Sequence, residues 1–494
     1  MPLPASEGVS RDLSRPLLLL VTLALFLALV LPRLTSRGMF FDGITYAAIA
    51  RNSAAGAGSF WNPHYTDTIY SSFHEHPPLA FWMQSIAFRV FGDSPYVESF
   101  YGLATGLVVL FLMMRLWAAL GGGERAGGWF PALLFAVFPL TSWILASNML
   151  ENTMTVFTTA AVLAVCRAAF AGSRAGRIVG GAVAGLLVAA AFLSKGPVGV
   201  FPIVAPFLCV LALPRARPSA GLAVFAGLFL ALLVVAGALY AAPEARDSLG
   251  IYLEKQVLAS VKGERGSGST FTFKTLKALI ADGMVPLALA AIVAFAHRRS
   301  APVRRDRRAL FMLLVGLSAS LPFFIGPRQS RYYLYPSIPF YMLALAFLFA
   351  GAAGALEERL RRSAAARGVA ATLAALLFAG AVAGAVAERG AVRKYGDFHE
   401  DFTVQKPAVP PGEVYSVLPP DLRHEWPFVA NMARCFRASL TDEPGHRYLI
   451  RRLDAAEPAP VGYRRIHPPA PRRYEVYERD ERTPAPVRAS RSRR

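Results

Sequence analysis

The sequence predicts an all-α polytopic membrane protein that ends in a small α/β domain. Of its 494 residues, 54% are hydrophobic and 17% are charged, whereas a soluble protein carries about a quarter charged residues. The apolar residues also fall in long blocks, each close to the roughly 20 residues that span a bilayer as a helix. These two observations exclude a soluble enzyme, a disulfide scaffold and a disordered chain.

The apolar blocks predict about eleven membrane-spanning helices. The first block follows Arg11 and Arg15 and has no small-residue cleavage site after it. It is therefore predicted to remain as a transmembrane helix with a cytoplasmic N-terminus. The expected spans are 16–34, 95–119, 127–147, 152–171, 178–193, 197–213, 219–242, 281–296, 309–325, 334–353 and 368–387.

One further apolar segment, 77–91, decides the topology. It is short, begins with two prolines and contains Arg89. If it does not cross the membrane, the arginine-rich loops all lie on the side of the N-terminus, as the positive-inside rule requires. We therefore expect a juxtamembrane element here, with the polar segments 35–76, 243–280 and 326–333 on the exoplasmic face.

The domain organisation follows from this topology. Short strand-like runs within a Pro-rich region predict a small α/β domain on the exoplasmic side, which ends in an Arg/Pro tail too polar to fold. The expected units are a membrane domain at 1–387 with a juxtamembrane loop at 35–94, a small domain at 388–480, and a disordered tail at 481–494.

Charge and cysteine content exclude two other classes. Lys and Arg exceed Asp and Glu by 52 − 32 = 20, but these basic residues lie in loops between apolar blocks. We interpret them as topology signals and expect no nucleic-acid partner. The chain has three cysteines, and Cys166 and Cys209 lie inside apolar segments, so no disulfide framework is predicted.

Two carboxylates begin helical segments on the expected exoplasmic face. Asp42 suits a helix N-cap, and Asn148 with Glu151 forms a weak variant of a capping box. However, ionisable groups at membrane depth are expensive and usually functional. A carboxylate at the mouth of a membrane cavity is also a natural general base for a hydroxyl nucleophile. Both interpretations stay open at this stage.

The run His74-Glu75-His76 offers ligand types for a divalent metal such as zinc. Consecutive residues point in different directions, however, so a complete metal site is not expected and no cofactor is predicted with certainty. His76 better suits a cation or hydrogen-bond donor that faces a phosphate. Lys195, in a Ser-Lys-Gly-Pro break between two spans, is either a snorkelling lysine or a fixed charge at the cavity mouth.

Arg328 and Arg331 have the same two interpretations as this lysine, and guanidinium groups match phosphate oxygens. Carboxylates and cations around one cavity suit a reaction whose donor is a lipid phosphate. The cations would stabilise the departing phosphate, while a carboxylate activates the acceptor.

This ordered set of motifs resembles the membrane glycosyltransferases of the protein O-mannosyltransferase superfamily, which have the GT-C fold. The likeness is greatest to the bacterial branch that contains the lipid A aminoarabinose transferases, and it covers roughly residues 38–340. The motifs are Asp42-x-x-x-Tyr46-Ala47, Glu75-His76-Pro77-Pro78-Leu79-x-x-Trp82, Glu151, Ser194-Lys195-Gly196-Pro197 and Arg331-Tyr332-Tyr333-Leu334-Tyr335-Pro336.

The resemblance implies a glycosyltransferase that moves a sugar from a polyprenyl (undecaprenyl) phosphate to an envelope acceptor, at the periplasmic face of the bacterial inner membrane. Asp42 and Glu151 would be catalytic. In related enzymes a metal is associated with the acidic residue that matches Glu75, and His74 is the other candidate ligand here. The expected substrate-binding residues are Tyr46, Glu75, His76, Lys195, Arg328, Arg331 and Tyr332.

The chain departs from the family pattern at four positions, and one of them is His76, where the aminoarabinose branch usually has a lysine. Gly43 and Thr45 replace a second acid and an arginine, and Glu98 stands where an arginine commonly follows the Pro-Pro-Leu element. These changes leave the reaction class intact and make the sugar and the acceptor open questions. Two other functions stay open: a transporter or flippase of lipid-linked or small solutes, and an assembly subunit without catalysis.

Overall fold

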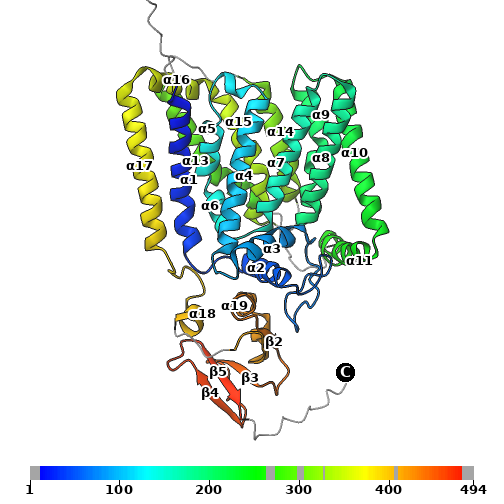
Figure 1. Ribbon diagram of the computed structural model, residues 1–494, viewed down its shortest axis with the longest axis vertical. Helices are drawn as coiled ribbons and strands as arrows, with labels where there is room; N and C mark the ends of the chain where they lie inside the picture. The colour runs from blue at the N-terminus through cyan, green and yellow to red at the C-terminus, as the bar shows by residue number, and fades with distance from the viewer. Residues whose placement is uncertain (1–11, 263–272, 298–304, 326–328, 405–409, 481–494) are drawn as a thin grey trace, which may run out of the picture.

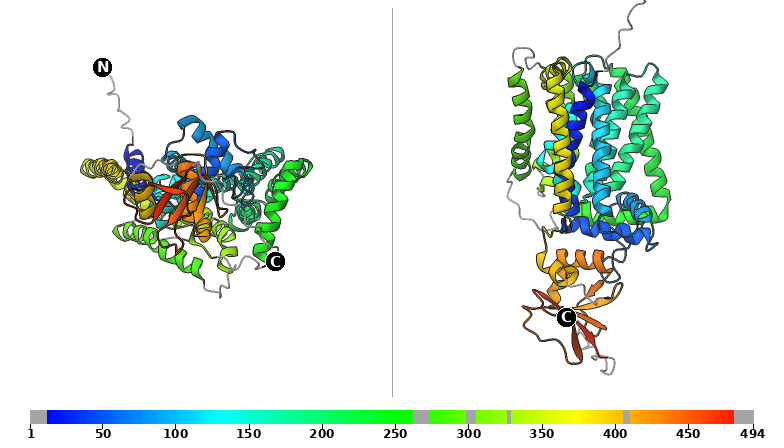
Figure 2. Two further views of the ribbon diagram at one scale, coloured as in Figure 1. Left: turned by 90° about the horizontal axis from the view of Figure 1, so that it is seen from below. Right: turned by 60° about the vertical axis from the view of Figure 1, so that its left-hand side comes forward.

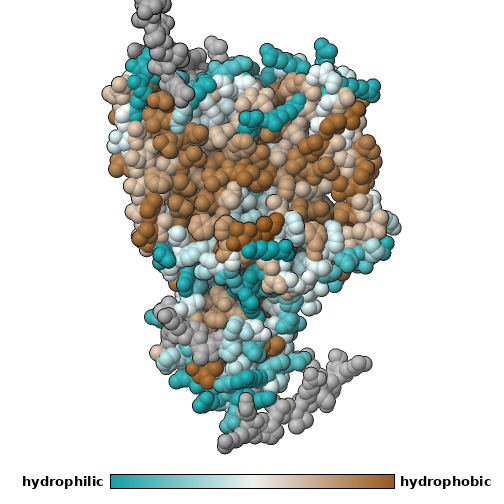
Figure 3. All heavy atoms as spheres, viewed as in Figure 1, coloured by the Kyte–Doolittle hydropathy of each residue, from teal (hydrophilic) through white to brown (hydrophobic). Residues whose placement is uncertain are grey.

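The computed structural model describes residues 12–262, 273–297, 305–325, 329–404 and 410–480. Its larger part is a bundle of membrane-spanning helices, and apolar residues predominate across the face of the bundle that Figure 3 shows. Within the described residues, eight helices are long and apolar enough to cross a membrane. They are α1 (Ser14–Thr35), α4 (Val97–Ala119), α7 (Leu150–Ala169), α8 (Arg174–Lys195), α10 (Pro218–Ala241), α13 (Lys274–Ala296), α14 (Arg307–Ile325) and α17 (Ala364–Ala387).

Two more of the expected spans are bent pairs of shorter helices. The first pair breaks by 73° before Pro139, and the second by 69° after Leu348. Counting each pair as one span gives ten in the described part of the chain. The pairs are α5 (Trp129–Val137) with α6 (Pro139–Ala146), and η5 (Arg331–Ser337) plus α15 (Ile338–Leu348) with α16 (Ala350–Arg362).

The remaining expected span, near 197–213, is shorter than a full crossing. Three prolines interrupt it, because a proline cannot donate to the helical hydrogen-bond ladder. It consists of the 3-10 turns η2 (Pro197–Gly199) and η3 (Phe201–Val204) followed by α9 (Ala205–Ala212). The fold class is confirmed, with a count of spans close to the one expected.

Three helices lie at the lower end of the bundle in Figure 1. They are α2 (Phe41–Ala54), α3 (Leu79–Phe91) and α11 (Pro243–Tyr252), which continues into the π-helical η4 (Leu253–Leu258) and α12 (Ala259–Val261). Helix α3 begins directly after the two prolines and is too short to cross the membrane. The expectation of juxtamembrane helices is therefore confirmed.

The C-terminal domain lies below these helices (Figures 1 and 2). Its sheet has the order β2-β1-β3-β5-β4, with β1 parallel to β2 and β3, and β5 antiparallel to β3 and β4. The elements are α18 (Gly396–His399), η6 (Glu400–Val404), β1 (Val414–Leu418), η7 (Pro420–His424), α19 (Trp426–Phe436), β2 (Ser439–Thr441), β3 (Tyr448–Arg452), β4 (Tyr463–His467) and β5 (Tyr474–Arg479). The predicted tail at 481–494 lies outside the described residues.

Helices α2 and α19 join the two parts of the molecule. The buried Arg51, in the last turn of α2, donates hydrogen bonds to the backbone oxygens of Arg434 (2.7 Å) and Ala433 (3.1 Å) near the end of α19. These carbonyls belong to the last turn of α19, where a cation complements the helix dipole; the Ala433 oxygen also accepts from the Arg437 N–H at 3.1 Å. The helix that carries Asp42 is therefore fixed at its far end by the C-terminal domain.

Candidate functional site

Helix α2 packs directly on the turn between α6 and α7. A Cβ atom at Gly43 would lie 1.8 Å from the backbone oxygen of Ser147. The Asn148 side chain donates a hydrogen bond to the backbone oxygen of Gly43 at 2.9 Å. No side chain fits between the two segments, which explains why glycine stands where the family pattern has a second acid.

The capping interpretations of Asp42 and Glu151 are wrong. The N-caps of α2 and α7 are Phe40 and Met149, and neither helix has a side-chain cap hydrogen bond. The side chain of Asn148 bonds Gly43 and Gln84 instead of capping α7. Neither carboxylate therefore caps its helix, although both lie in the first turn.

Glu151 forms a buried ion pair with Lys195. The Lys195 Nζ lies 2.8 Å from Glu151 Oε1, and the two side chains are 6% and 0% exposed. Neither carboxylate oxygen of Glu151 accepts a hydrogen bond with acceptable geometry from a described residue. The pair thus has Coulomb attraction but few of the hydrogen bonds that normally stabilise buried charges.

Asp42 is half-buried beside this pair. Burial raises the pKa of its carboxyl to about 6; Lys195 opposes the rise, and the carboxylates of Glu151 and Glu75 add to it. We call these four residues, Asp42, Glu75, Glu151 and Lys195, the carboxylate–lysine cluster. A carboxyl with a pKa near 6 is well suited to take a proton from a hydroxyl group at neutral pH.

The chain break after α8 places Lys195 in the cluster. Gly196 has a φ of +96°, which favours glycine, and Tyr252 donates a hydrogen bond to the backbone oxygen of Lys195 at 3.3 Å. The Nζ atom lies 5.9 Å and 5.8 Å from the ring centres of Tyr332 and Tyr333. Aromatic faces stabilise the ammonium group without neutralising it.

The residues before α3 have separate partners. Nε2 of His76 lies 3.1 Å from the hydroxyl of the buried Tyr46. Tyr70 and Gln256 donate to Glu75 Oε1 at 2.7 Å and 3.3 Å. Within the described parts of the chain, no three His, Cys, Asp or Glu side chains are grouped to hold a metal ion. His74 instead contacts Asn62 at 3.1 Å, so the residues present do not fit a metal site.

Of the two arginines expected near the donor phosphate, the structure describes Arg331. The guanidinium of Arg331 forms an ion pair of 2.9 Å with Asp282 on α13, while the ring of the neighbouring Tyr332 lies 5.9 Å from the Lys195 Nζ. Arg328 lies outside the described residues. Among the residues that the structure describes, Lys195 is therefore the cation that lies beside Asp42 and Glu151.

Sequence reasoning missed Tyr333, Tyr252 and Gln256, which complete the surroundings of the cluster. Tyr333 directly follows Tyr332, so the aromatic pair was visible in the sequence. No local signal placed Tyr252 or Gln256, because α11 and η4 meet the cluster only through tertiary packing.

Glu98 contacts the C-terminal domain. Arg434 on α19 donates hydrogen bonds of 3.0 Å to both Glu98 oxygens, and one of 2.7 Å to Asp93. One guanidinium group has enough N–H donors to bond both carboxylates at once. The departure from the family pattern at position 98 is thus part of an ion-pair network that docks the small domain.

The fold and the cluster define a class: a multi-pass membrane protein with the GT-C fold, which has charged groups at one end of its bundle. Residues 75–240 match the family model of dolichyl-phosphate-mannose-protein mannosyltransferases. The crystal structure of ArnT from Cupriavidus metallidurans bound to undecaprenyl phosphate superposes with a TM-score of 0.58 and 17% identity, and covers 92% of this chain and 96% of that one.

The related sequences of known name are sugar transferases. The chain is 28% identical over 324 residues to an undecaprenyl phosphate-α-4-amino-4-deoxy-L-arabinose arabinosyl transferase from Pseudomonas aeruginosa, covering 63% of this chain and 56% of the relative. A transferase of the same name from Proteus mirabilis is 29% identical over 40% of this chain and 35% of its own length. The resemblance to this superfamily and its bacterial branch is confirmed, although the chain spans 56% of the length of the first relative and 35% of the second.

Proposed function

We propose that the protein is a membrane glycosyltransferase that takes a sugar from a polyprenyl phosphate. The observation that carries this proposal is the carboxylate–lysine cluster, which joins a carboxyl of pKa about 6 to a buried lysine. The relatives named above are transferases of a sugar carried on undecaprenyl phosphate. A base and a cation side by side are the two groups that such a transfer requires.

In the proposed reaction, Asp42 takes the proton of the acceptor hydroxyl. The acceptor oxygen forms a bond to the anomeric carbon as the bond from that carbon to the phosphate oxygen breaks. The electron pair of the broken bond remains on the polyprenyl phosphate, whose growing charge the Lys195 ammonium stabilises. Phosphate needs no general acid to leave, and a single displacement inverts the anomeric carbon.

The remaining cluster residues have positioning roles in this proposal. Glu151 holds Lys195 in place through their ion pair of 2.8 Å, and Glu75 with Tyr46 and His76 forms the wall next to α3. Tyr332 lies against the lysine on the opposite side. Arg331 has a more remote role at most, because its described partner is Asp282.

The proposed orientation follows the positive-inside rule. The start of α1 and the arginine-bearing connections lie at one end of the bundle, and the cluster and the C-terminal domain lie at the other (Figure 1). We place the arginine-rich end in the cytoplasm and the cluster at the periplasmic face of the inner membrane. Lipid A, a protein and another glycan are the candidate acceptors.

A comparative mass-spectrometric profile tests this function. A null strain is complemented with the wild type or with Asp42→Asn, and lipid-linked sugars and envelope glycans are measured. We expect one polyprenyl-phosphate sugar to accumulate, and one glycan to lose that sugar, in both the null and the mutant. A change confined to an unrelated solute would instead favour a transporter.

A further inference from the structure

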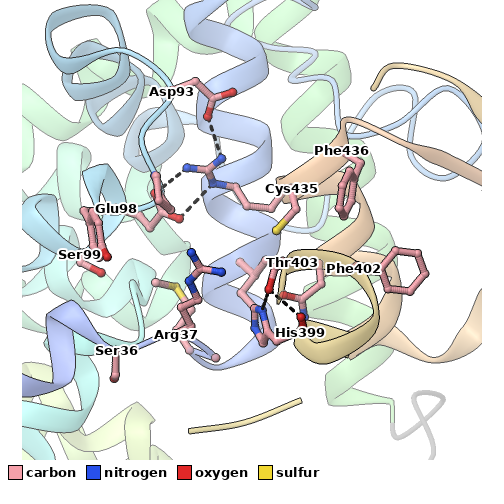
Figure 4. A pocket seen from close by; sticks show the side chains of 17 residues that line it. Ser36, Arg37, Asp93, Glu98, Ser99, His399, Phe402, Thr403, Cys435 and Phe436 are labelled. Carbon is pink, nitrogen blue, oxygen red and sulfur yellow. Dashed lines mark hydrogen bonds and ion pairs between the residues drawn. The ribbon is translucent and has the colours of Figure 1, made fainter. Parts of the chain in front are cut away.

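A cavity lies between the C-terminal domain and the membrane part (Figure 4). Its volume is about 370 Å³, and Ile44 lines it on the α2 side. Ile44 is two residues after Asp42, and two residues correspond to a rotation of about 200° around a helix. This cavity therefore faces away from Asp42 and the carboxylate–lysine cluster. We call it the junction cavity; the polar side chains that the argument uses are Arg37, Glu98, His399, Thr403, Arg434 and Cys435.

His399 presents an unpartnered acceptor to the junction cavity. Its side chain is buried (5% exposed), and its Nε2 has no hydrogen-bond partner among the described residues. The Thr403 hydroxyl donates to the backbone oxygen of His399 at 2.8 Å, so that hydroxyl can only accept from His399 Nδ1, 3.3 Å away. The proton of the neutral ring is therefore on Nδ1, and Nε2 carries a lone pair.

The ring of His399 stays neutral near pH 7. Burial and the neighbouring guanidinium of Arg37 lower the pKa of its imidazole to about 4. A group that fills this part of the cavity must therefore donate a hydrogen bond to Nε2, because a buried acceptor without a donor is costly.

Arg37 supplies a cation to the same cavity. Figure 4 shows its guanidinium inside the cavity, and no described residue forms an ion pair or a side-chain hydrogen bond with it. The acidic groups nearby are already used, since Glu98 and Asp93 are both bonded to Arg434. The cavity therefore offers a ligand one cation, on Arg37, and one hydrogen-bond acceptor, His399 Nε2.

We propose that the junction cavity binds a hydroxylated phosphate, such as a sugar or polyol phosphate. Arg37 pairs with a phosphate oxygen, and a hydroxyl of the same ligand donates to His399 Nε2. A simple anion such as sulfate satisfies only the arginine, and a neutral polyol satisfies only the histidine. The apolar walls formed by Met39, Phe402 and Phe436 suit the carbon face of such a ligand.

Two kinds of molecule carry a phosphate and a hydroxyl group together in this way. Helix α1 ends at Thr35, next to the Ser36 that lines the cavity, so the cavity lies at the level where an apolar span meets the polar juxtamembrane region. A lipid headgroup and a soluble sugar phosphate both reach this level. The proposal does not depend on the proposed transferase activity.

Cys435 provides a direct readout of occupancy. It is exposed and lines the junction cavity, whereas Cys166 and Cys209 are buried in the bundle. The full-length protein is labelled with a fluorescent maleimide in phosphatidylcholine nanodiscs, with or without sn-glycerol 3-phosphate, sulfate or glycerol. A parallel sample uses phosphatidylglycerol nanodiscs, whose headgroup is itself a hydroxylated phosphate.

We expect slower labelling of Cys435 with sn-glycerol 3-phosphate or in phosphatidylglycerol, and unchanged labelling with sulfate or glycerol. Protection by the soluble probe assigns the site to free sugar phosphates, and protection only in phosphatidylglycerol assigns it to a headgroup. Equal protection by sulfate, or no protection by any probe, would overturn the proposal.

Two variants identify the contacts. Arg37→Gln and His399→Phe should each weaken binding of the protecting probe about tenfold, as expected for the loss of one charge-assisted or buried hydrogen bond. The matched control is Arg33→Gln, an exposed arginine at the end of α1 that is outside the cavity; it should bind as the wild type does. Wild-type binding by Arg37→Gln would refute the site even if His399→Phe fails to fold.

Discussion

The charge network at the domain junction and the carboxylate–lysine cluster differ in how completely their groups are bonded. At the domain junction, Arg434 donates four hydrogen bonds, to Glu98, Asp93 and the backbone oxygen of Ser94. In the carboxylate–lysine cluster, Lys195 reaches Glu151 at 2.8 Å, yet neither Glu151 oxygen has a hydrogen bond from a described residue.

This difference separates a network that holds structure from one that is suited to chemistry. Fully bonded buried charges rigidify a fold, and the junction network docks one domain on another. Under-bonded charges with a perturbed pKa are typical of functional sites. The following predictions use this contrast, from the largest expected effect to the smallest.

Asp42→Asn should remove the proposed base without disturbing the fold. A general base contributes about 10²–10⁴-fold to a rate, so we expect transfer to fall about 10³-fold. Transfer is measured with purified protein and extracted polyprenyl-phosphate sugar, and folding by the thermal midpoint. Unchanged transfer at an unchanged midpoint would contradict the role of Asp42 as base.

Glu151→Gln should leave the Lys195 ammonium buried without a counter-charge, at a cost of about 3 kcal/mol of stability. The double variant Glu151→Gln/Lys195→Met removes both charges and should recover most of that stability but no transfer. Chemical denaturation in mild detergent gives the stabilities. A double variant as unstable as the single one would show that the two charges are not coupled.

Arg434→Met should weaken the docking of the C-terminal domain on the membrane part by about 2 kcal/mol, because it leaves Glu98 unpaired in the interior. Limited proteolysis between the two domains should become faster. The control is Arg437→Gln, which removes an exposed pair with the same Asp93 and should cost under about 1 kcal/mol. Equal proteolysis of both variants would assign the docking to other contacts.

The pH profile of transfer should report the Asp42 pKa of about 6. Transfer requires the carboxylate form, so kcat/KM should fall below about pH 6 and level off above it. Because the Glu75 carboxylate raises this pKa, Glu75→Gln should move the midpoint to lower pH. Glu244→Gln, on the exposed side of α11, should leave it in place, and a Glu75→Gln profile with the wild-type midpoint would remove Glu75 from the cluster.

The sequence was sufficient for the bundle because apolar length and arginine placement report directly on the membrane. The same argument from the arginine-rich loops predicted that 77–91 does not cross the membrane, and α3 is indeed a short helix at the end of the bundle. Sequence spacing also put Glu151 and Lys195 on one face, since both stand at the same end of neighbouring spans. Their pairing at 2.8 Å is the geometric consequence.

The sequence misled where the partner is distant along the chain. The motif of Asn148 and Glu151 suits a capping box, but Asn148 bonds α2 instead. The ion pair of Arg331 with Asp282, on another helix, had no local signal either. Glu98 gave no local sign that it would meet Arg434, because the two are separated by 336 residues.

The inverted charge at position 98 also limits how this protein can be recombined with its relatives. A chimera that carries the C-terminal domain of a relative would lose Arg434 and would leave Glu98 without the guanidinium that bonds both of its oxygens. Grafts across this boundary should therefore be made with positions 98 and 434 exchanged together, so that the donor and recipient halves remain compatible.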